Sequence, residues 1–123
     1  MSITTHVLDT SRGRPAASVP VVLAFRSESG AWREIGRGAT DDDGRLRTLV
    51  PAGAALERGV YRITFDTGAY FAAQGVQGFY PEASIVFEVR APEEPTANEP
   101  SNSQHYHVPL LLNPFGYSTY RGS

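Results

Sequence analysis

The chain has 123 residues, of which 41% are hydrophobic and 20% are charged. This size and composition are typical of one globular domain, so we expect a single domain over residues 1–123. The formal net charge of −2 gives no broad basic field for nucleic acid, and the absence of cysteine excludes disulfides, thiolate metal sites and a cysteine nucleophile.

The first residues, "MSITTHVLD", lack the basic segment and apolar run of a secretory signal. Nowhere do 18 apolar residues follow one another, which is the length that a membrane-spanning helix requires. We therefore expect a soluble cytoplasmic protein with no membrane partner.

Alternation of apolar and polar residues with a period of two dominates the sequence and predicts an all-β chain. The expected strands cover residues 3–9, 19–28, 31–37, 45–50, 60–66, 83–90, 105–112 and 116–121. Between the fifth and sixth strands, "TGAYFAAQG" is Ala-rich and flanked by glycine, which favours one short helix. Short strands joined by regular turns predict a two-sheet β-sandwich.

Three of these strands carry a clear apolar face. Their expected core residues are Val19, Val21, Leu23 and Phe25, then Tyr61, Ile63 and Phe65, and then Ala83, Ile85, Phe87 and Val89. Residues 91–104, "APEEPTANEPSNSQ", are polar and proline-rich without an apolar face, so we expect a long flexible loop there.

The acidic run "TDDDGRLRT" resembles a calcium loop at first sight. The spacing contradicts that interpretation, because counting Gly44 as loop position six puts Ala39 and Val50 where carboxylates are required. A hairpin fits better, with Asp43 and Gly44 in the tight turn and Arg45 at the start of the returning strand.

The three histidines are the best candidates for acid–base chemistry. His105 and His107 are two residues apart in a strand, so both side chains should project from one face. The simplest alternative is that they are polar residues on an exposed face. A second alternative is a zinc site in which His6 is the third ligand and Asp9 supports a ligand from behind.

The chain resembles the 5-hydroxyisourate hydrolases, the transthyretin-related enzymes of urate breakdown. The resemblance is carried by "HVLDTSRGRPAASVPVVL", "TDDDGR", "YRITFDTGAYF", "FYPEASIVFEV" and "HYHVPLLLNPFGYSTYRGS". The terminal Tyr-Arg-Gly-Ser is the signature that separates these hydrolases from transthyretin, the hormone carrier with the same fold. The only departure is the loop 91–104, which is longer and more acidic than the family needs.

The resemblance implies a transthyretin-like β-sandwich of two four-stranded sheets with one short helix, assembled as a homotetramer with sites between dimers. It implies ring-opening hydrolysis of 5-hydroxyisourate to 2-oxo-4-hydroxy-4-carboxy-5-ureidoimidazoline, with no cofactor and no metal. The residues to which it gives catalytic roles are His6, Arg45, His107 and Ser123. Those to which it gives substrate-binding roles are His6, Arg45, His105, Tyr120, Arg121 and Gly122.

Our hypothesis is that His6 and His107 together position and deprotonate the water, while Arg45 holds the anionic edge of the substrate. Tyr120 and Ser123 would complete the pocket by hydrogen bonding. The last strand is expected at a sheet edge, where it can pair with a second subunit. Two rival functions are a transthyretin-like carrier, which predicts an apolar ligand channel, and a β-sandwich interaction module, which would not need this C-terminus.

Overall fold

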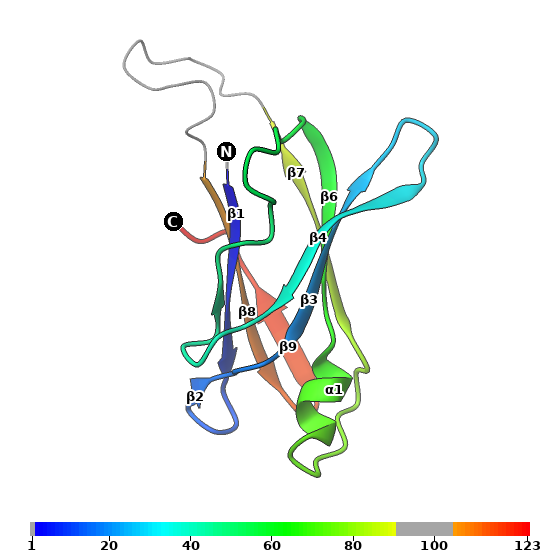
Figure 1. Ribbon diagram of the computed structural model, residues 1–123. Helices are drawn as coiled ribbons and strands as arrows, with labels where there is room; N and C mark the ends of the chain where they lie inside the picture. The colour runs from blue at the N-terminus through cyan, green and yellow to red at the C-terminus, as the bar shows by residue number, and fades with distance from the viewer. Residues whose placement is uncertain (1, 91–104) are drawn as a thin grey trace.

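The computed structural model describes residues 2–90 and 105–123 as two packed β-sheets with one short helix at one end (Figure 1). The strands are β1 Ser2–Asp9, β2 Arg14–Pro15, β3 Pro20–Arg26, β4 Trp32–Ala39, β5 Arg45–Leu46, β6 Gly59–Phe65, β7 Ala83–Val89, β8 His105–Asn113 and β9 Gly116–Thr119, and the helix is α1 Thr67–Ala72. The prediction of a two-sheet sandwich with one short helix is confirmed. The flexible loop predicted at 91–104 lies outside the described residues.

The first sheet has the order β2-β1-β8-β9, and β5 pairs with β1 beside β2. This sheet has five strands instead of four, because β2 is a two-residue strand that the sequence pattern did not reveal. The second sheet has the predicted four strands, in the order β4-β3-β6-β7. Strand β9 lies at an edge of the first sheet, as expected.

The core lies between the sheets and is built from the faces that the alternation predicts. Val21, Leu23, Ile63 and Phe65 are at most 1% exposed. Ile85 and Phe87 are only partly buried and pack against this cluster. The inner face of β8 adds the buried Tyr106, Val108, Leu110 and Leu112, so the outer face of this strand carries its polar residues.

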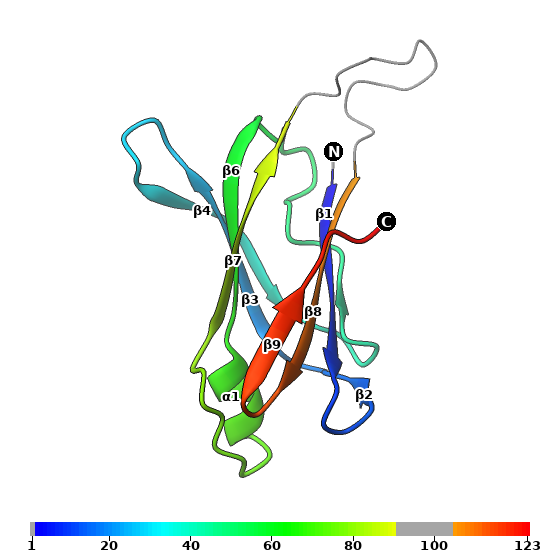
Figure 2. The same ribbon diagram turned by 180° about the vertical axis from the view of Figure 1, so that it is seen from behind.

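The helix begins after Asp66, whose carboxylate accepts a hydrogen bond of 2.9 Å from the amide of Ala69. This is an N-terminal cap, which satisfies one of the free amides of the first turn. Tyr70 and Phe71 pack into the core from the helix. The helix closes the end of the sandwich opposite the two chain termini (Figures 1 and 2).

One predicted strand is mostly wrong. The expected strand 45–50 ends at Leu46, because the chain then turns to bury Leu49 fully in the core. The carbonyl of Leu49 packs so closely against Gly36 of β4 that a Cβ on Gly36 would lie 1.9 Å from it. The segment after β5 therefore serves to bury an apolar side chain and does not extend a ladder.

Candidate active site

Parallel pairing of β1 with β8 brings the two ends of the chain together. Its register sets Thr4 opposite His107 and His6 opposite Pro109. Because side chains two residues apart share a face of a strand, Thr4, His6, His105 and His107 all lie on the outer face of the first sheet. Residues a hundred positions apart thus form one polar surface.

Hydrogen bonds hold all three imidazoles. The hydroxyl oxygen of Thr4 lies 2.8 Å from Nδ1 of His107 and 3.3 Å from Nε2 of His105. The rings of His105 and His107 are nearly parallel, with centroids 6.2 Å apart. Nε2 of His6 donates to the carbonyl of Asp43 at 2.9 Å. A carbonyl can only accept, so His6 carries its hydrogen on Nε2.

The acidic turn positions Arg45 beside the histidines. The carboxylate of Asp41 accepts hydrogen bonds from the amides of Asp43 at 2.9 Å and Arg45 at 3.0 Å. The bond from the Arg45 amide, followed by that from Asp43, outweighs partial desolvation and keeps the pKa of Asp41 below its usual value. Gly44 has a φ of 75° and carries the backbone through a conformation that side chains disfavour.

The predicted hairpin through this turn is wrong in its pairing. Strand β5 does not pair with β4. It pairs with β1 in the other sheet, where Arg45 lies opposite His6. The tight turn at Asp43 and Gly44 is present, but it carries the chain from one sheet to the other. Arg45 reaches the histidines for that reason.

The C-terminal segment closes over β8. After β9 it crosses β8 and ends near β1 (Figure 2), and the amide of Gly122 donates to the carbonyl of His107 at 2.9 Å. A Cβ on Gly122 would lie 2.5 Å from Cδ2 of His107 and 3.2 Å from Cγ of Pro109. Only glycine fits this close approach, and it brings Ser123 to the histidine surface.

These elements line a small pocket of about 170 Å³. Its lining residues are Thr4, Thr5, Arg45, Arg47, His105, His107 and Ser123. Four residues that the sequence analysis assigned to the site therefore meet here. His6 borders the pocket from the next position along β1, opposite Arg45.

Two predicted substrate-binding residues lie away from this pocket. Tyr120 is 59% exposed. The guanidinium of Arg121 lies 5.0 Å from the ring centroid of Tyr106, a residue of the inner face of β8. Within this chain, neither side chain contributes to the pocket lining.

The pKa of His107 is lowered from the usual 6.5. Burial is the largest cause, because it disfavours the charged imidazolium, and the electrostatic interactions with His105, Arg45 and His6 act in the same direction. His107 is therefore neutral at neutral pH, and a neutral imidazole is able to accept a proton from water.

The zinc alternative finds no support in the described geometry. Among residues 2–90 and 105–123, no three His, Asp or Glu side chains are grouped so that they could hold a metal ion. Asp9, the suggested supporting carboxylate, binds the hydroxyl of Tyr70 and the groups of Ser11 and Arg12 instead.

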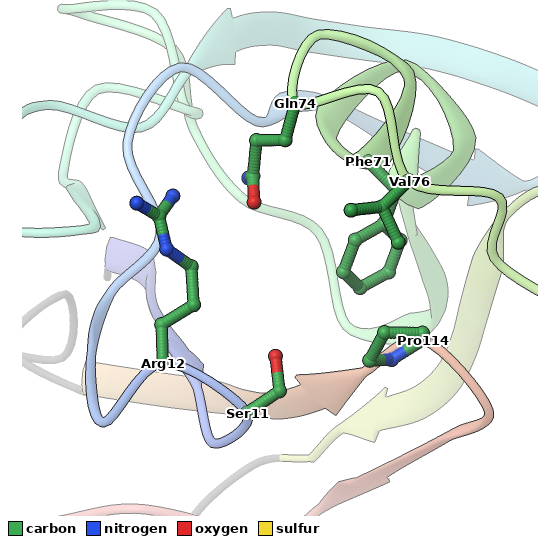
Figure 3. Close-up of a pocket in the computed structure, with 6 residues that line it drawn as sticks. All are labelled: Ser11, Arg12, Phe71, Gln74, Val76 and Pro114. Carbon is green, nitrogen blue, oxygen red and sulfur yellow. The ribbon is translucent and has the colours of Figure 1, made fainter.

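A second hollow of about 490 Å³ lies beside α1 (Figure 3). It is larger than the histidine pocket, and its lining residues are Ser11, Arg12, Phe71, Gln74, Val76 and Pro114. None of these side chains is a general base at neutral pH. By size alone this hollow would be the candidate active site, but only the histidine pocket has side chains that can act as an acid or a base.

Sequence reasoning missed three polar residues of the pocket lining, Thr4, Thr5 and Arg47. Thr4 touches both imidazoles, and Arg47 lines the pocket beside Arg45. The signal for Thr4 was its spacing, since it precedes His6 by two residues in a predicted strand. The signal for Arg47 was also its spacing, since it follows Arg45 by two residues in a predicted strand.

Comparison with known proteins identifies the family. The model of the HIUase/Transthyretin family matches residues 3–122. The chain belongs to this family. It is 42% identical over 121 residues to the 5-hydroxyisourate hydrolase of Salmonella typhimurium, which covers 98% of this chain and 80% of that protein.

Solved structures of two family members have the same fold. The 5-hydroxyisourate hydrolase of Klebsiella pneumoniae aligns over the full length of both chains, with 34% identity and a TM-score of 0.78. Transthyretin from Sparus aurata aligns over 98% of this chain and 95% of its own, also with 34% identity, and a TM-score of 0.83. Both branches of the family share the sandwich, so the fold alone does not distinguish hydrolase from carrier.

Proposed function

We propose that this family member hydrolyses 5-hydroxyisourate to 2-oxo-4-hydroxy-4-carboxy-5-ureidoimidazoline, a step of urate degradation. The observation that carries the proposal is the pocket in which a neutral imidazole, a guanidinium and the C-terminal Ser123 meet. The hydrolases named among the relatives support the same activity. We take residues 1–123 as one catalytic domain, and this domain contains the pocket.

His107 is the proposed general base. Its Nδ1 contacts Thr4, which leaves Nε2 for a water molecule in the pocket. In the neutral form, this nitrogen takes a proton from the water as the oxygen attacks a ring carbonyl of the substrate. His6, which has its Nε2 committed to Asp43, offers Nδ1 to the same water.

Arg45 supplies the positive charge that the reaction needs. Attack on the carbonyl places negative charge on its oxygen and then on the departing ring nitrogen. A guanidinium donates two parallel hydrogen bonds to such a planar anionic edge. The hydroxyl of Ser123 completes the polar lining and hydrogen-bonds the substrate.

Assembly as a homotetramer is part of the proposal. The pocket lies on the outer face of a sheet, so a second copy of the chain would exclude water from it. Among the strands that the structure describes, β9 has no neighbour on its outer edge and can pair with a second copy. The exposed Tyr120 lies just beyond that strand. In the tetramer, Tyr120, Arg121 and His105 would bind substrate from around the pocket.

The carrier alternative predicts an apolar ligand channel. The pocket found here is lined by threonine, arginine, histidine and serine, a lining suited to a polar, anionic ring system. This chemistry favours the hydrolase over a carrier.

The decisive experiment mixes the purified protein with freshly generated 5-hydroxyisourate and follows its ultraviolet absorbance against spontaneous decay. We expect decay to accelerate in proportion to protein concentration and to survive dialysis against a strong chelator. A decay rate equal to that in buffer would overturn the proposed activity. Loss of activity that added zinc restores would instead favour a metal site.

A truncated protein distinguishes the role of the C-terminal segment in assembly from its role in catalysis. Deleting residues 120–123 removes Ser123 from the pocket and should abolish most activity in protein that remains folded by circular dichroism. Light scattering shows whether the tetramer is lost as well. Full activity in the truncated protein would contradict the role given to the C-terminus.

No helix among the described residues is long and apolar enough to cross a membrane. The cytoplasmic location stays a prediction from the sequence, and cell fractionation tests it.

A further inference from the structure

The contact of one hydroxyl with two imidazoles is not explained by the roles given above. Thr4 Oγ1 lies between Nδ1 of His107, at 2.8 Å, and Nε2 of His105, at 3.3 Å. Nδ1 of His105 continues the chain to the hydroxyl of Ser2, at 2.5 Å. Ser2, His105, Thr4 and His107 therefore form one continuous hydrogen-bonded row across β1 and β8.

The hydroxyl of Thr4 couples the protonation states of the two neutral rings. It has one hydrogen, so it donates to one ring and must accept from an N–H of the other. Either His107 carries its hydrogen on Nδ1 and His105 has a bare Nε2, or the reverse arrangement holds. The two arrangements leave opposite states at Nε2 of His107, which is the nitrogen available to the pocket.

The charges around the pocket select between these arrangements. Arg45 and Arg47 line it together with His107, and their guanidinium groups offer only N–H donors. A ring nitrogen among donors is stabilised as an acceptor, so Nε2 of His107 is favoured without a hydrogen. His107 then donates from Nδ1 to Thr4, and Thr4 donates to His105.

We propose that Thr4 is a positioning residue: by accepting from Nδ1–H of His107 it stabilises the tautomer that the guanidinium groups favour, and so leaves Nε2 free as the base. The row ends at the exposed side of the sheet, where His105 donates from its Nδ1 to Ser2. Thr4 itself is nearly buried, at 8% exposure, so solvent does not replace its hydroxyl easily. This inference rests on the proposed function for its catalytic consequence, but the tautomer is measurable without substrate.

Three variants of the full chain test the assignment. Thr4→Val keeps the size and branching of the side chain and removes the hydroxyl, whereas Thr4→Ser keeps the hydroxyl. Thr64→Val is the matched control, because Thr64 also pairs through its hydroxyl, with Ser84 at 3.1 Å on the other sheet. Circular dichroism and melting curves check that each variant folds.

The first measurement is the tautomer. Long-range ¹H–¹⁵N correlations of uniformly labelled protein, recorded at a pH where the histidines are neutral, distinguish Nδ1–H from Nε2–H imidazole. We expect Nδ1–H for His107 in the wild type, in Thr4→Ser and in Thr64→Val. In Thr4→Val, Nδ1–H loses its acceptor while both guanidinium groups remain, so we expect a partial shift toward Nε2–H. An Nε2–H tautomer in the wild type, or an unchanged tautomer in Thr4→Val, would overturn the proposal.

The second measurement is catalysis. Loss of an orienting partner typically costs roughly 10- to 100-fold, so we expect a fall of this size in kcat for Thr4→Val with a smaller change in KM. Thr4→Ser should stay within a few-fold of the wild type, and Thr64→Val should match it. Equal rates for Thr4→Val and the wild type would overturn the positioning role. Inactive wild-type protein with the expected tautomers would overturn the proposed function while supporting the tautomer assignment.

Discussion

Strand β1 carries one polar cluster at each end, and the two clusters differ in what they leave open. Near its start, Thr4 contacts His105 and His107 on the outer face of the sheet, and the His107 ring keeps one nitrogen for the pocket. At its end, Asp9 is 1% exposed and every contact it makes is internal. We propose proton transfer for the first cluster, whereas the contacts of the second stabilise the fold.

The Asp9 cluster connects the loop after β1 to the helix. Its Oδ1 accepts from the amide of Ser11 at 3.0 Å and from the hydroxyl of Ser11 at 2.5 Å, and its Oδ2 accepts from the hydroxyl of Tyr70 at 2.7 Å. Burial alone would raise the pKa of Asp9, but these bonds and that from the Arg12 amide outweigh burial and lower it. A buried carboxylate with both oxygens hydrogen-bonded inside the protein stabilises the fold and is not accessible to substrate.

The largest effect should come from removing the proposed base. We expect His107→Ala to lower kcat by roughly 10²- to 10⁴-fold, because the attacking water loses its proton acceptor. The melting temperature and circular dichroism should stay near those of the wild type, since His107 is only half-buried. A loss of only a few-fold in folded protein would remove His107 from catalysis.

The next effect tests the close approach of the C-terminus. Gly122→Ala places a Cβ 2.5 Å from Cδ2 of His107, so the ring or the tail must move, and a misplacement of this kind costs about 10²-fold in kcat/KM. Gly116→Ala is the matched control, since its Cβ would meet only the amide nitrogen of Asn113, at 3.9 Å. Similar kinetics for the two variants would contradict the tight contact.

A substitution in the Asp9 cluster should lower stability and leave activity unchanged, which is the opposite of the effect expected at the histidine pocket. Asp9→Asn cannot accept from Ser11 and Tyr70 at once, so we expect the free energy of unfolding to fall by about 1–3 kcal/mol. The activity of the folded fraction should be unchanged. The exposed Asp42 provides a control, and Asp42→Asn should change the free energy of unfolding by less than about 0.5 kcal/mol in urea titrations. A lower kcat in folded Asp9→Asn would contradict this separation, because it would show that the Asp9 cluster also affects catalysis.

The lowered pKa of Asp9 also gives its contribution a pH dependence. A carboxyl group whose pKa is lower in the folded state stabilises the fold above the usual value of 3.8, and this stabilisation is lost as the pH falls through the folded-state pKa. The wild type should therefore lose its stability advantage over Asp9→Asn in strongly acidic urea titrations. An advantage that persists there would contradict the hydrogen-bonded carboxylate.

The smallest effect is a shift of the pH profile. Because the pKa of His107 is lowered, the acid limb of kcat/KM should lie below pH 6.5, and the base stays active in mildly acidic solution. His105→Asn removes an imidazole whose electrostatic interaction lowers the pKa of His107, so its acid limb should move to higher pH while the effects of Arg45 and His6 remain. A limb at or above 6.5 in the wild type would contradict the lowered pKa.

The sequence by itself determined most of the strands, their apolar faces and the identity of the proposed catalytic side chains. Period-two alternation fixes which side of a strand is apolar, and this rule placed His105 and His107 on the face opposite Val108 and Leu110. The motifs "HVLD", "DGR" and "YRGS" identified the family, which the comparison confirms.

Only the tertiary structure decided how those residues meet. The parallel register of β1 with β8 sets Thr4 against His107, and the crossing of β5 to β1 brings Arg45 opposite His6. Neither pairing follows from local pattern, because a strand's alternation specifies its buried face but not its partner or its register. Thr4 is the clearest case, since a threonine in a strand gains a role only when the chain's far end places two imidazoles beside its hydroxyl.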